Sequence, residues 1–136
     1  SKVIEADKKH EKYGESVVII TYGRGVYWSL EASKSFAGKI EILDLRTLSP
    51  LDEDQILKSV KNHGKSLIVT EEPSSSSFSL GIAGFIQENC FEFLDAPVKI
   101  VGSENTPAIP LNENLEYTYL PNASEVKKAI SSLLEY

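Results

Sequence analysis

The stretch "VVIITYGRG", residues 17–25, decides the fold. Its first six residues form an apolar, β-branched run that is typical of a strand buried on both faces, and the glycines after it indicate a turn into a helix. Two further runs, "KIEILDL" at residues 39–45 and "SLIVTEE" at residues 66–72, have the same character. Strands of this kind occur in mainly parallel sheets with helices on both sides, which predicts an α/β fold.

Helical patterns separate these runs and predict a three-layer α/β/α sandwich. In the first helix we expect an inner face of Val26, Leu30, Ser33 and Ala37, with Gly38 at its end. The second spans residues 49–64, with Pro50 near its start and Gly64 at its end. Ser74–Ser77 precede and cap the third, residues 78–94, whose expected inner face is Phe78, Ile82, Phe85 or Ile86, Cys90 and Phe93. A fourth strand at residues 96–102, a surface passage at 106–121, a final helix from Asn122 capped by Asn122 or Ser124, and an edge strand at residues 1–7 complete the prediction.

The length and the charge of the chain exclude several classes of function. A chain of 136 residues fits one domain, which we divide into an edge strand and linker (1–16) and an α/β core (17–136). Its formal charge of −6 and its two arginines, Arg24 and Arg46, argue against nucleic acid and against an anionic membrane surface. The polar start and the absence of a long apolar run argue against a secretory signal or a membrane span. We therefore expect a cytoplasmic protein.

The single cysteine, Cys90, lies in an apolar helical pattern and predicts a buried thiol in a reducing compartment. A nucleophilic role for it requires a neighbouring base, and His10 and His63 both fall in polar stretches.

The turn at residues 21–29, "TYGRGVYWS", has two glycines spaced as in a dinucleotide-binding turn. Asp44 lies about twenty residues further on, where such a site has an acidic residue for a ribose hydroxyl. Trp28, however, stands where that fingerprint needs a glycine for close packing of the helix on the strand. A phosphate-accepting receiver domain is disfavoured as well, because "TYGRG" replaces the acidic pair that it needs after the first strand. We interpret Gly23 and Gly25 as structural residues.

Other candidate groups are few. Glu71 and Glu72 are adjacent at a strand end, where their side chains point to opposite faces and cannot easily share a proton. We expect Glu71 to form a structural ion pair with Arg46, since both lie at the ends of strands that we expect to be neighbours. No serine, histidine and acid stand in a nucleophile-elbow context, and no glycine-rich loop carries a phosphate-binding lysine. The residues alone thus predict an α/β/α domain without a visible active site.

Five stretches in order resemble one family: "VVIITYG", "IEILDLRTLSPLDEDQI", "SLIVTEE", "FEFLDAPVKIVGSENTP" and "YLP". They are similar to the carboxyl-terminal domain of the beta subunit of 2-oxo acid dehydrogenase decarboxylase components, of the pyruvate and branched-chain kind. The most specific parts are residues 44–52 and 94–107. The chain departs from the family pattern at Ser74–Ser77 and Gly81, where a glycine-rich turn is usual, and at residues 108–117.

The resemblance implies the fold of the last domain of transketolase, a five-stranded mixed sheet whose first strand, here residues 1–7, is an antiparallel edge. It also implies that thiamine diphosphate and magnesium lie in other parts of the parent enzyme and that this domain holds no cofactor. Its implied partners are a second beta subunit, an alpha subunit or fused alpha region, and the peripheral binding domain of the acyltransferase.

Our first hypothesis is therefore a non-catalytic assembly domain of a thiamine-dependent 2-oxo acid dehydrogenase, with a slight preference for the branched-chain substrate 2-oxoisovalerate. The parent enzyme is expected to decarboxylate a 2-oxo acid, and the isolated domain is expected to be inactive. Candidate interface residues are Glu125, Glu135 and Tyr136, although Glu125 also suits the positive end of a helix. The alternative is a stand-alone small-molecule-binding or regulatory domain that uses the strand ends near Gly23, Arg24 and Arg46.

Overall fold

The computed structural model describes residues 2–5, 14–46, 51–103 and 122–136. The surface passage expected at residues 106–121 and the residues Pro50 and His10 lie outside this part of the chain. Strands and helices alternate along it in the following order: β1 Lys2–Glu5, β2 Val17–Thr21, α1 Arg24–Ser33, β3 Ile40–Asp44, α2 Glu53–His63, β4 Ser66–Pro73, α3 Ser77–Cys90, the 3₁₀ helix η2 Phe91–Phe93, β5 Lys99–Ser103 and α5 Ala123–Leu134. The α/β fold class is confirmed.

The strands form one sheet in the order β1-β3-β2-β4-β5. Strands β3, β2, β4 and β5 are parallel, and β1 pairs with the outer side of β3 in the antiparallel direction. Val18 of β2 lies level with Glu41 of β3 and with Ser66 of β4, so these three side chains share one face of the sheet. The division of the chain into a linker that ends at residue 16 and a core from residue 17 stays a prediction.

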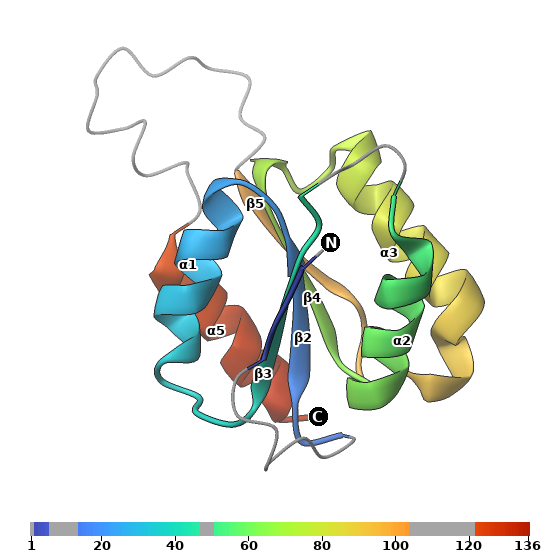
Figure 1. Ribbon diagram of the computed structural model, residues 1–136, viewed down its shortest axis with the longest axis horizontal. Helices are drawn as coiled ribbons and strands as arrows, with labels where there is room; N and C mark the ends of the chain where they lie inside the picture. Colours follow the sequence, from blue (N-terminus) through green and yellow to red (C-terminus); the bar gives the residue numbers. More distant parts are fainter. Residues whose placement is uncertain (1, 6–13, 47–50, 104–121) are drawn as a thin grey trace.

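Two helical layers cover the sheet, α1 with α5 on one side and α2 with α3 on the other (Figure 1). The central strand β2 supplies both cores. Val17 and Ile19 pack in the cluster beneath α1 and α5, whereas Val18 and Ile20 pack in the cluster beneath α2 and α3. All four side chains are fully buried, and burying an aliphatic side chain of this size contributes roughly 1.5–3 kcal/mol.

Helix α2 ends at the predicted glycine and begins four residues after the predicted start. The Asp52 carboxylate accepts a hydrogen bond from the backbone N–H of Gln55 at 3.3 Å, which caps the first turn. Gly64 ends the helix in the left-handed conformation, with φ of 77°, which few residues other than glycine adopt readily. The predicted end at Gly64 is confirmed, and the helix begins at Glu53.

The starts of α3 and α5 are also capped by side chains. The Ser76 hydroxyl accepts from the backbone N–H of Ser79 at the start of α3, which confirms that the serine run caps this helix. At α5 the cap is Asn122, whose side chain accepts from the backbone N–H of Glu125. The predicted inner position of Phe93 is wrong. The α-helix ends at Cys90 and passes into η2, where Phe93 is 40% exposed and the Lys61 ammonium lies 5.3 Å from its ring centre.

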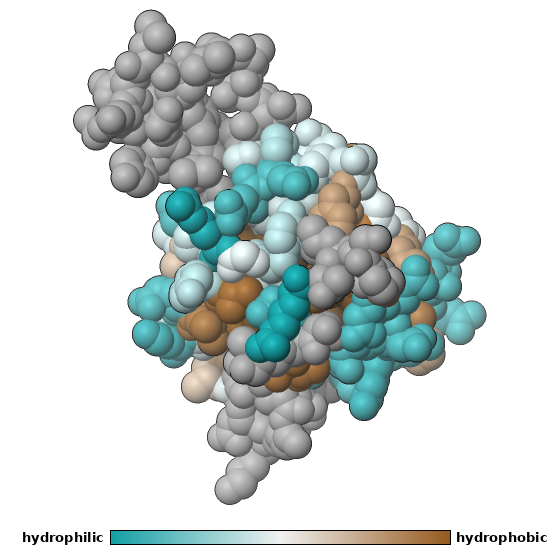
Figure 2. Space-filling model, turned by 45° about the horizontal axis from the view of Figure 1, so that its top comes forward, coloured by the Kyte–Doolittle hydropathy of each residue, from teal (hydrophilic) through white to brown (hydrophobic). Residues whose placement is uncertain are grey.

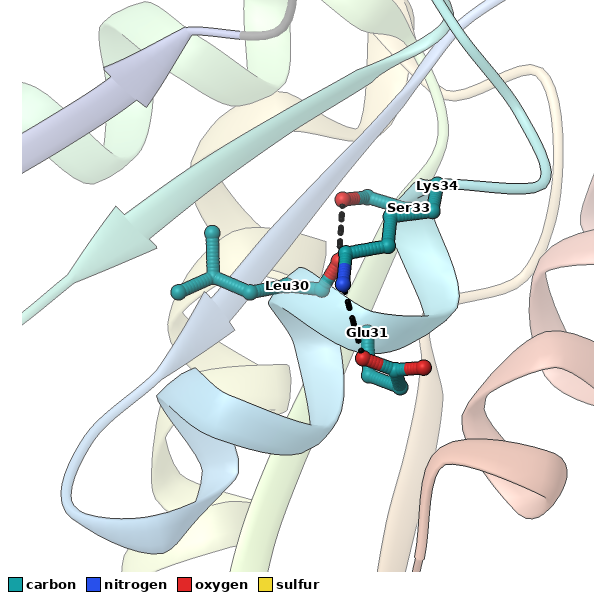
Figure 3. A network of polar contacts seen from close by, with 4 residues as sticks. All are labelled: Leu30, Glu31, Ser33 and Lys34. Carbon is teal, nitrogen blue, oxygen red and sulfur yellow. Dashed lines mark hydrogen bonds and ion pairs between the residues drawn. The ribbon is translucent and has the colours of Figure 1, made fainter.

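The rotation of α1 differs from the prediction. Its buried residues are Gly25, Ser29 and Ala32, so the expected face is wrong at Leu30 and at Ala37, which are exposed, and the helix ends at Ser33. Gly25 causes this difference, because its backbone packs directly on the ends of the strands and turns that side of the helix inward. At the far end of α1, the Ser33 hydroxyl donates to the Leu30 carbonyl, and Lys34 pairs with Glu31 at 3.1 Å (Figure 3).

Candidate functional site

The turn between β2 and α1 is built around two glycines. Gly23 has φ of 58° and ψ of −131°, a backbone conformation that side chains other than hydrogen rarely allow. Gly25 is buried, and a Cβ atom there would collide with the Thr21 hydroxyl oxygen and lie 3.1 Å from the Val69 carbonyl oxygen. Both glycines therefore serve the packing of α1 on the strand ends.

A carboxylate of the neighbouring strand occupies the amino end of α1. Glu71 Oε1 accepts a hydrogen bond from the backbone N–H of Arg24 at 3.0 Å. In nucleotide-binding sites, the free N–H groups at the start of a helix bind a phosphate group. Here one of these N–H groups already has an anionic partner. A phosphate placed at this turn would meet the like charge of Glu71. The geometry therefore agrees with a structural turn rather than a dinucleotide site.

Arg46 follows β3 at the same edge of the sheet. It has a left-handed backbone, φ 52°, and its backbone N–H donates to Asp44 Oδ1 at 3.1 Å. Its side-chain Nε lies 3.8 Å from Asp44 Oδ2, and the Arg46 side chain is 58% exposed. Arg46 and Glu71 thus each have a partner other than the one expected, and their direct ion pair stays a prediction. Figure 2, which brings this edge forward, shows hydrophilic side chains between separate hydrophobic patches.

Tyr22 joins the ends of β2 and β4. Its hydroxyl lies 2.9 Å from the Thr70 hydroxyl, and its ring meets the Phe78 ring edge-on at 5.4 Å. Burial raises the pKa of Tyr22 above its ordinary value, and the nearby carboxylates of Glu72 and Glu71 add to this, while the hydrogen bond with Thr70 opposes it. These contacts hold α3 against the strand ends and keep the phenol neutral.

A buried polar cluster at the opposite edge was not predicted. His63, expected in a polar stretch, is only 1% exposed, which corrects that expectation. Its Nδ1 lies 2.5 Å from the Ser16 hydroxyl, and its Nε2 lies 3.7 Å from Glu41 Oε1, within reach of an ion pair. Ile56 and Val60 define the inner face of α2, and His63 lies at helical spacing on the same face. This spacing is the sequence feature from which its burial could have been predicted.

Glu41 is the charged member of this cluster, with a side chain only 7% exposed. Burial acts to raise its pKa, but the interactions with His63 and Ser59 and the charge of Lys58 outweigh burial, so the pKa of Glu41 lies below its ordinary value. Among the described residues, no hydrogen-bond partner is found for Glu41 Oε2, His63 Nε2 or Ser66 Oγ. The cluster is enclosed, so a substrate does not reach it, and its role is structural.

A surface hollow of about 410 Å³ lies where α3, η2 and the end of the chain meet. Two exposed aromatic side chains border it, Phe91 at 67% and Tyr136 at 63% exposure. Its charged lining residue is Asp95, and Glu135 precedes Tyr136 in the chain. The complete lining is Gln87, Phe91, Leu94, Asp95, Ala96, Pro97 and Tyr136.

The structure brings two of the three expected interface residues together. Glu135 and Tyr136 follow α5 directly, and Tyr136 lines the hollow. Glu125 lies in the first turn of the same helix, about 15 Å away by helix rise, where its carboxylate pairs with Lys128 at 3.7 Å. Its place at the positive end of α5 agrees with the helix-dipole interpretation.

Reactive groups of other kinds are scarce in the described ranges. Cys90 is fully buried, as predicted, and burial raises the pKa of its thiol, opposed by Lys61. Within residues 2–5, 14–46, 51–103 and 122–136, no three His, Cys, Asp or Glu side chains group so as to hold a metal ion. No helix of this part is long and apolar enough to cross a bilayer.

Comparison with known proteins identifies one domain family. The family model described as transketolase, C-terminal domain matches residues 5–126. The chain is 33% identical to the 2-oxoisovalerate dehydrogenase subunit beta of Bacillus subtilis over 97% of its own length and 41% of that protein. It is 35% identical to the pyruvate dehydrogenase E1 component subunit beta of Rickettsia felis, over 90% of this chain and 38% of that one.

A third relative is the acetoin:2,6-dichlorophenolindophenol oxidoreductase subunit beta of Cupriavidus necator, with 37% identity over 85% of this chain and 35% of the relative. A solved structure described as a split gene transketolase, inactive beta4 tetramer, superposes with a TM-score of 0.71, 21% identity and coverage of 91% of this chain and 41% of that one. It shares the fold. The chain spans about two fifths of the length of the relatives it matches.

Proposed function

The chain belongs to the transketolase C-terminal domain family, and from this premise we propose that it is the non-catalytic assembly domain of a thiamine diphosphate-dependent 2-oxo acid dehydrogenase. The relatives named as beta subunits of 2-oxoisovalerate and pyruvate dehydrogenases support this assignment. In this proposal the domain pairs beta subunits, contacts the alpha subunit or a fused alpha region, and docks the peripheral binding domain of the acyltransferase.

The observation that carries the docking role is the hollow beside Tyr136. Exposed aromatic side chains at a concave surface are typical anchor points in protein interfaces, and Phe91 and Tyr136 are both more than 60% exposed there. Asp95 gives the hollow a negative charge, and Glu92 and Glu135 are adjacent in sequence to Phe91 and Tyr136. This combination favours a partner with an apolar anchor and basic side chains around it.

We propose that thiamine diphosphate and its magnesium ion are held by other parts of the parent enzyme. A diphosphate–metal group needs free N–H donors or acidic ligands gathered at one place. Here Glu71 already accepts from the start of α1, and the described residues offer no group of three potential metal ligands. The described residues therefore do not fit this cofactor, and we expect the isolated chain to be inactive.

For the substrate, we propose that the parent enzyme prefers branched-chain 2-oxo acids such as 2-oxoisovalerate. The match to the 2-oxoisovalerate dehydrogenase subunit beta supports this, because it extends over 97% of the chain. Decarboxylation by the full-length parent with thiamine diphosphate, measured with 2-oxoisovalerate and with pyruvate, tests the preference. Equal kcat/KM values for the two acids would contradict it.

Docking is tested by calorimetric titration of the chain with the peripheral binding domain of the acyltransferase. We expect Tyr136→Ala and Phe91→Ala each to weaken binding by roughly tenfold or more, as buried aromatic anchors do. Glu135→Lys is expected to reduce the salt dependence of binding, because it removes an acidic group at the rim.

The matched control is Tyr27→Ala, which removes an aromatic side chain of similar exposure, 74%, from α1. It is expected to leave the affinity unchanged. If Tyr27→Ala weakens binding as much as Tyr136→Ala does, the hollow is not the docking surface. If the chain does not bind the peripheral binding domain at all, the docking role fails.

A further inference from the structure

Three buried polar atoms on one side of the sheet have no hydrogen-bond partner among the described residues. They are Glu41 Oε2, His63 Nε2 and Ser66 Oγ. Their residues are 5%, 1% and 0% exposed, so bulk solvent does not reach them. Leaving a buried polar atom unbonded costs free energy, and nearly all such atoms in folded proteins bond either to another protein group or to an ordered water molecule.

The topology of the sheet brings these three residues together. Glu41 in β3 and Ser66 in β4 both lie level with Val18 in the strand between them, so the three side chains leave the same face of the sheet. His63 ends the helix that covers this face, and its ring lies beside Glu41. Ser66 follows His63 by only three residues. The three atoms therefore gather between the sheet and the end of α2.

The contact between His63 and Glu41 is too long for a direct hydrogen bond. His63 Nε2 lies 3.7 Å from Glu41 Oε1, whereas an N–H···O bond spans about 2.7–3.2 Å. The other ring nitrogen, Nδ1, lies 2.5 Å from the Ser16 hydroxyl, so the ring is held in place from that side while Nε2 stays unbonded. Polar atoms at such a separation in a buried site are commonly joined by a water molecule.

The chemistry of the three groups fits water and disfavours an ion. The Glu41 carboxylate repels an anion, and the described part of the chain gathers no three His, Cys, Asp or Glu side chains that could hold a metal cation. Water both donates and accepts hydrogen bonds. It can therefore donate to the carboxylate and take whichever role the imidazole nitrogen and the hydroxyl leave open.

We propose that one water molecule is bound here as a permanent part of the fold, donating to Glu41 Oε2 and hydrogen-bonded to His63 Nε2 and Ser66 Oγ. Three hydrogen bonds are typical of a buried water molecule. This water joins β3, α2 and β4, and it supplies the partners that the protein itself does not. The site is independent of the proposed function, because it uses only groups inside the core.

A high-resolution crystal structure of the chain tests the proposal directly. We expect a well-ordered water molecule within about 3.2 Å of all three atoms. A His63 ring bonded directly to the Glu41 carboxylate, with no water between the ring and Ser66, would overturn the proposal.

A pair of serine variants gives a second test in solution. Ser29 Oγ is also buried without a partner among the described residues, but it lies in α1 on the other side of the sheet, away from the three atoms. A water molecule needs two to four polar partners, so we expect none at Ser29. Ser66→Ala and Ser29→Ala thus remove the same hydroxyl group from a hydrated and from a dry site.

Urea unfolding measures the difference between the two variants. Ser66→Ala takes one of its three partners from the water and is expected to raise the equilibrium constant of unfolding roughly fivefold, the effect of one lost hydrogen bond. Ser29→Ala is expected to leave this constant unchanged or to lower it. In a dry site, removal of the Ser66 hydroxyl would have the same effect as Ser29→Ala. A Ser66→Ala variant no less stable than Ser29→Ala therefore contradicts the bound water.

Discussion

His63 and Glu41 meet inside the fold, His63 Nε2 lying 3.7 Å from Glu41 Oε1, with side chains 1% and 7% exposed. They join the end of α2 to the second residue of β3, and the Ser16 hydroxyl holds the other ring nitrogen of His63. The contact connects three segments that are distant in sequence. Its strength therefore affects the whole sheet rather than one helix.

The pH dependence of stability follows from Glu41. Its pKa in the fold lies below the ordinary 4.5, so its ionisation contributes stability that is fully present above about pH 5 and is lost as pH falls through the folded pKa. We expect the free energy of unfolding by urea to fall between pH 5 and pH 3, with a smaller slope in Glu41→Gln. Glu31→Gln, at a 61% exposed side chain, is the control and is expected to keep the wild-type slope. A Glu41→Gln slope equal to that of wild type would contradict the assignment.

Truncation of the histidine is expected to be costly. His63→Ala leaves a cavity, removes the partner of the Ser16 hydroxyl and leaves the Glu41 carboxylate buried without its imidazole neighbour, which should lower the free energy of unfolding by roughly 3 kcal/mol. Asn62→Ala, at the exposed neighbouring position, should change it by less than about 0.5 kcal/mol. Chemical denaturation of both variants checks this, and similar values for the two would show that the cluster is not important for stability.

Two substitutions one turn apart on α1 should have opposite effects. Gly25→Ala places a methyl group against the Thr21 hydroxyl and the Val69 carbonyl, and should destabilise the fold by at least about 2 kcal/mol. Ser29→Ala removes a buried hydroxyl for which the described residues give no partner, and should leave stability equal or raise it by up to about 1 kcal/mol. Thermal unfolding measures both. A Gly25→Ala variant as stable as wild type would contradict the close packing of α1.

The carboxylate at the start of α1 should act as a helix cap. Glu71→Ala removes the acceptor of the Arg24 N–H and should cost about 1 kcal/mol, measured by urea unfolding. Glu71→Gln keeps an acceptor oxygen without the charge and should retain most of that stability. Equal losses in the two variants would indicate that charge, rather than the hydrogen bond, makes the contribution.

Local chemistry was enough to predict the strands, the end of α2 and the caps of α3 and α5. The β-branched residues of β2, the capping hydroxyl of Ser76 and the glycine at Gly64 each act within a few residues, so a local sequence pattern is sufficient to predict them. The rotation of α1 could not be predicted in this way. It depends on contact between Gly25 and Val69, which are 44 positions apart and meet only after the sheet has formed.

The polar groups were the hardest to place for the same reason. Glu41 stands between two isoleucines of a buried strand, a position that requires a partner, and the helix phase of His63 offers one. Only the packing of α2 on the sheet brings the two side chains together. Likewise, Glu125 and Glu135 look equivalent in the sequence, whereas the rigid length of α5 separates them. Local patterns predicted the elements, and tertiary geometry decided which side chains meet.

The burial of the central strand β2 on both faces has a consequence for how the protein unfolds. Val17 and Ile19 belong to one core and Val18 and Ile20 to the other, so neither helical layer can leave without uncovering residues of the strand that the remaining layer needs. Unfolding of one side therefore exposes the strand on which the opposite side packs, and we expect the two halves to lose order in a single all-or-none step.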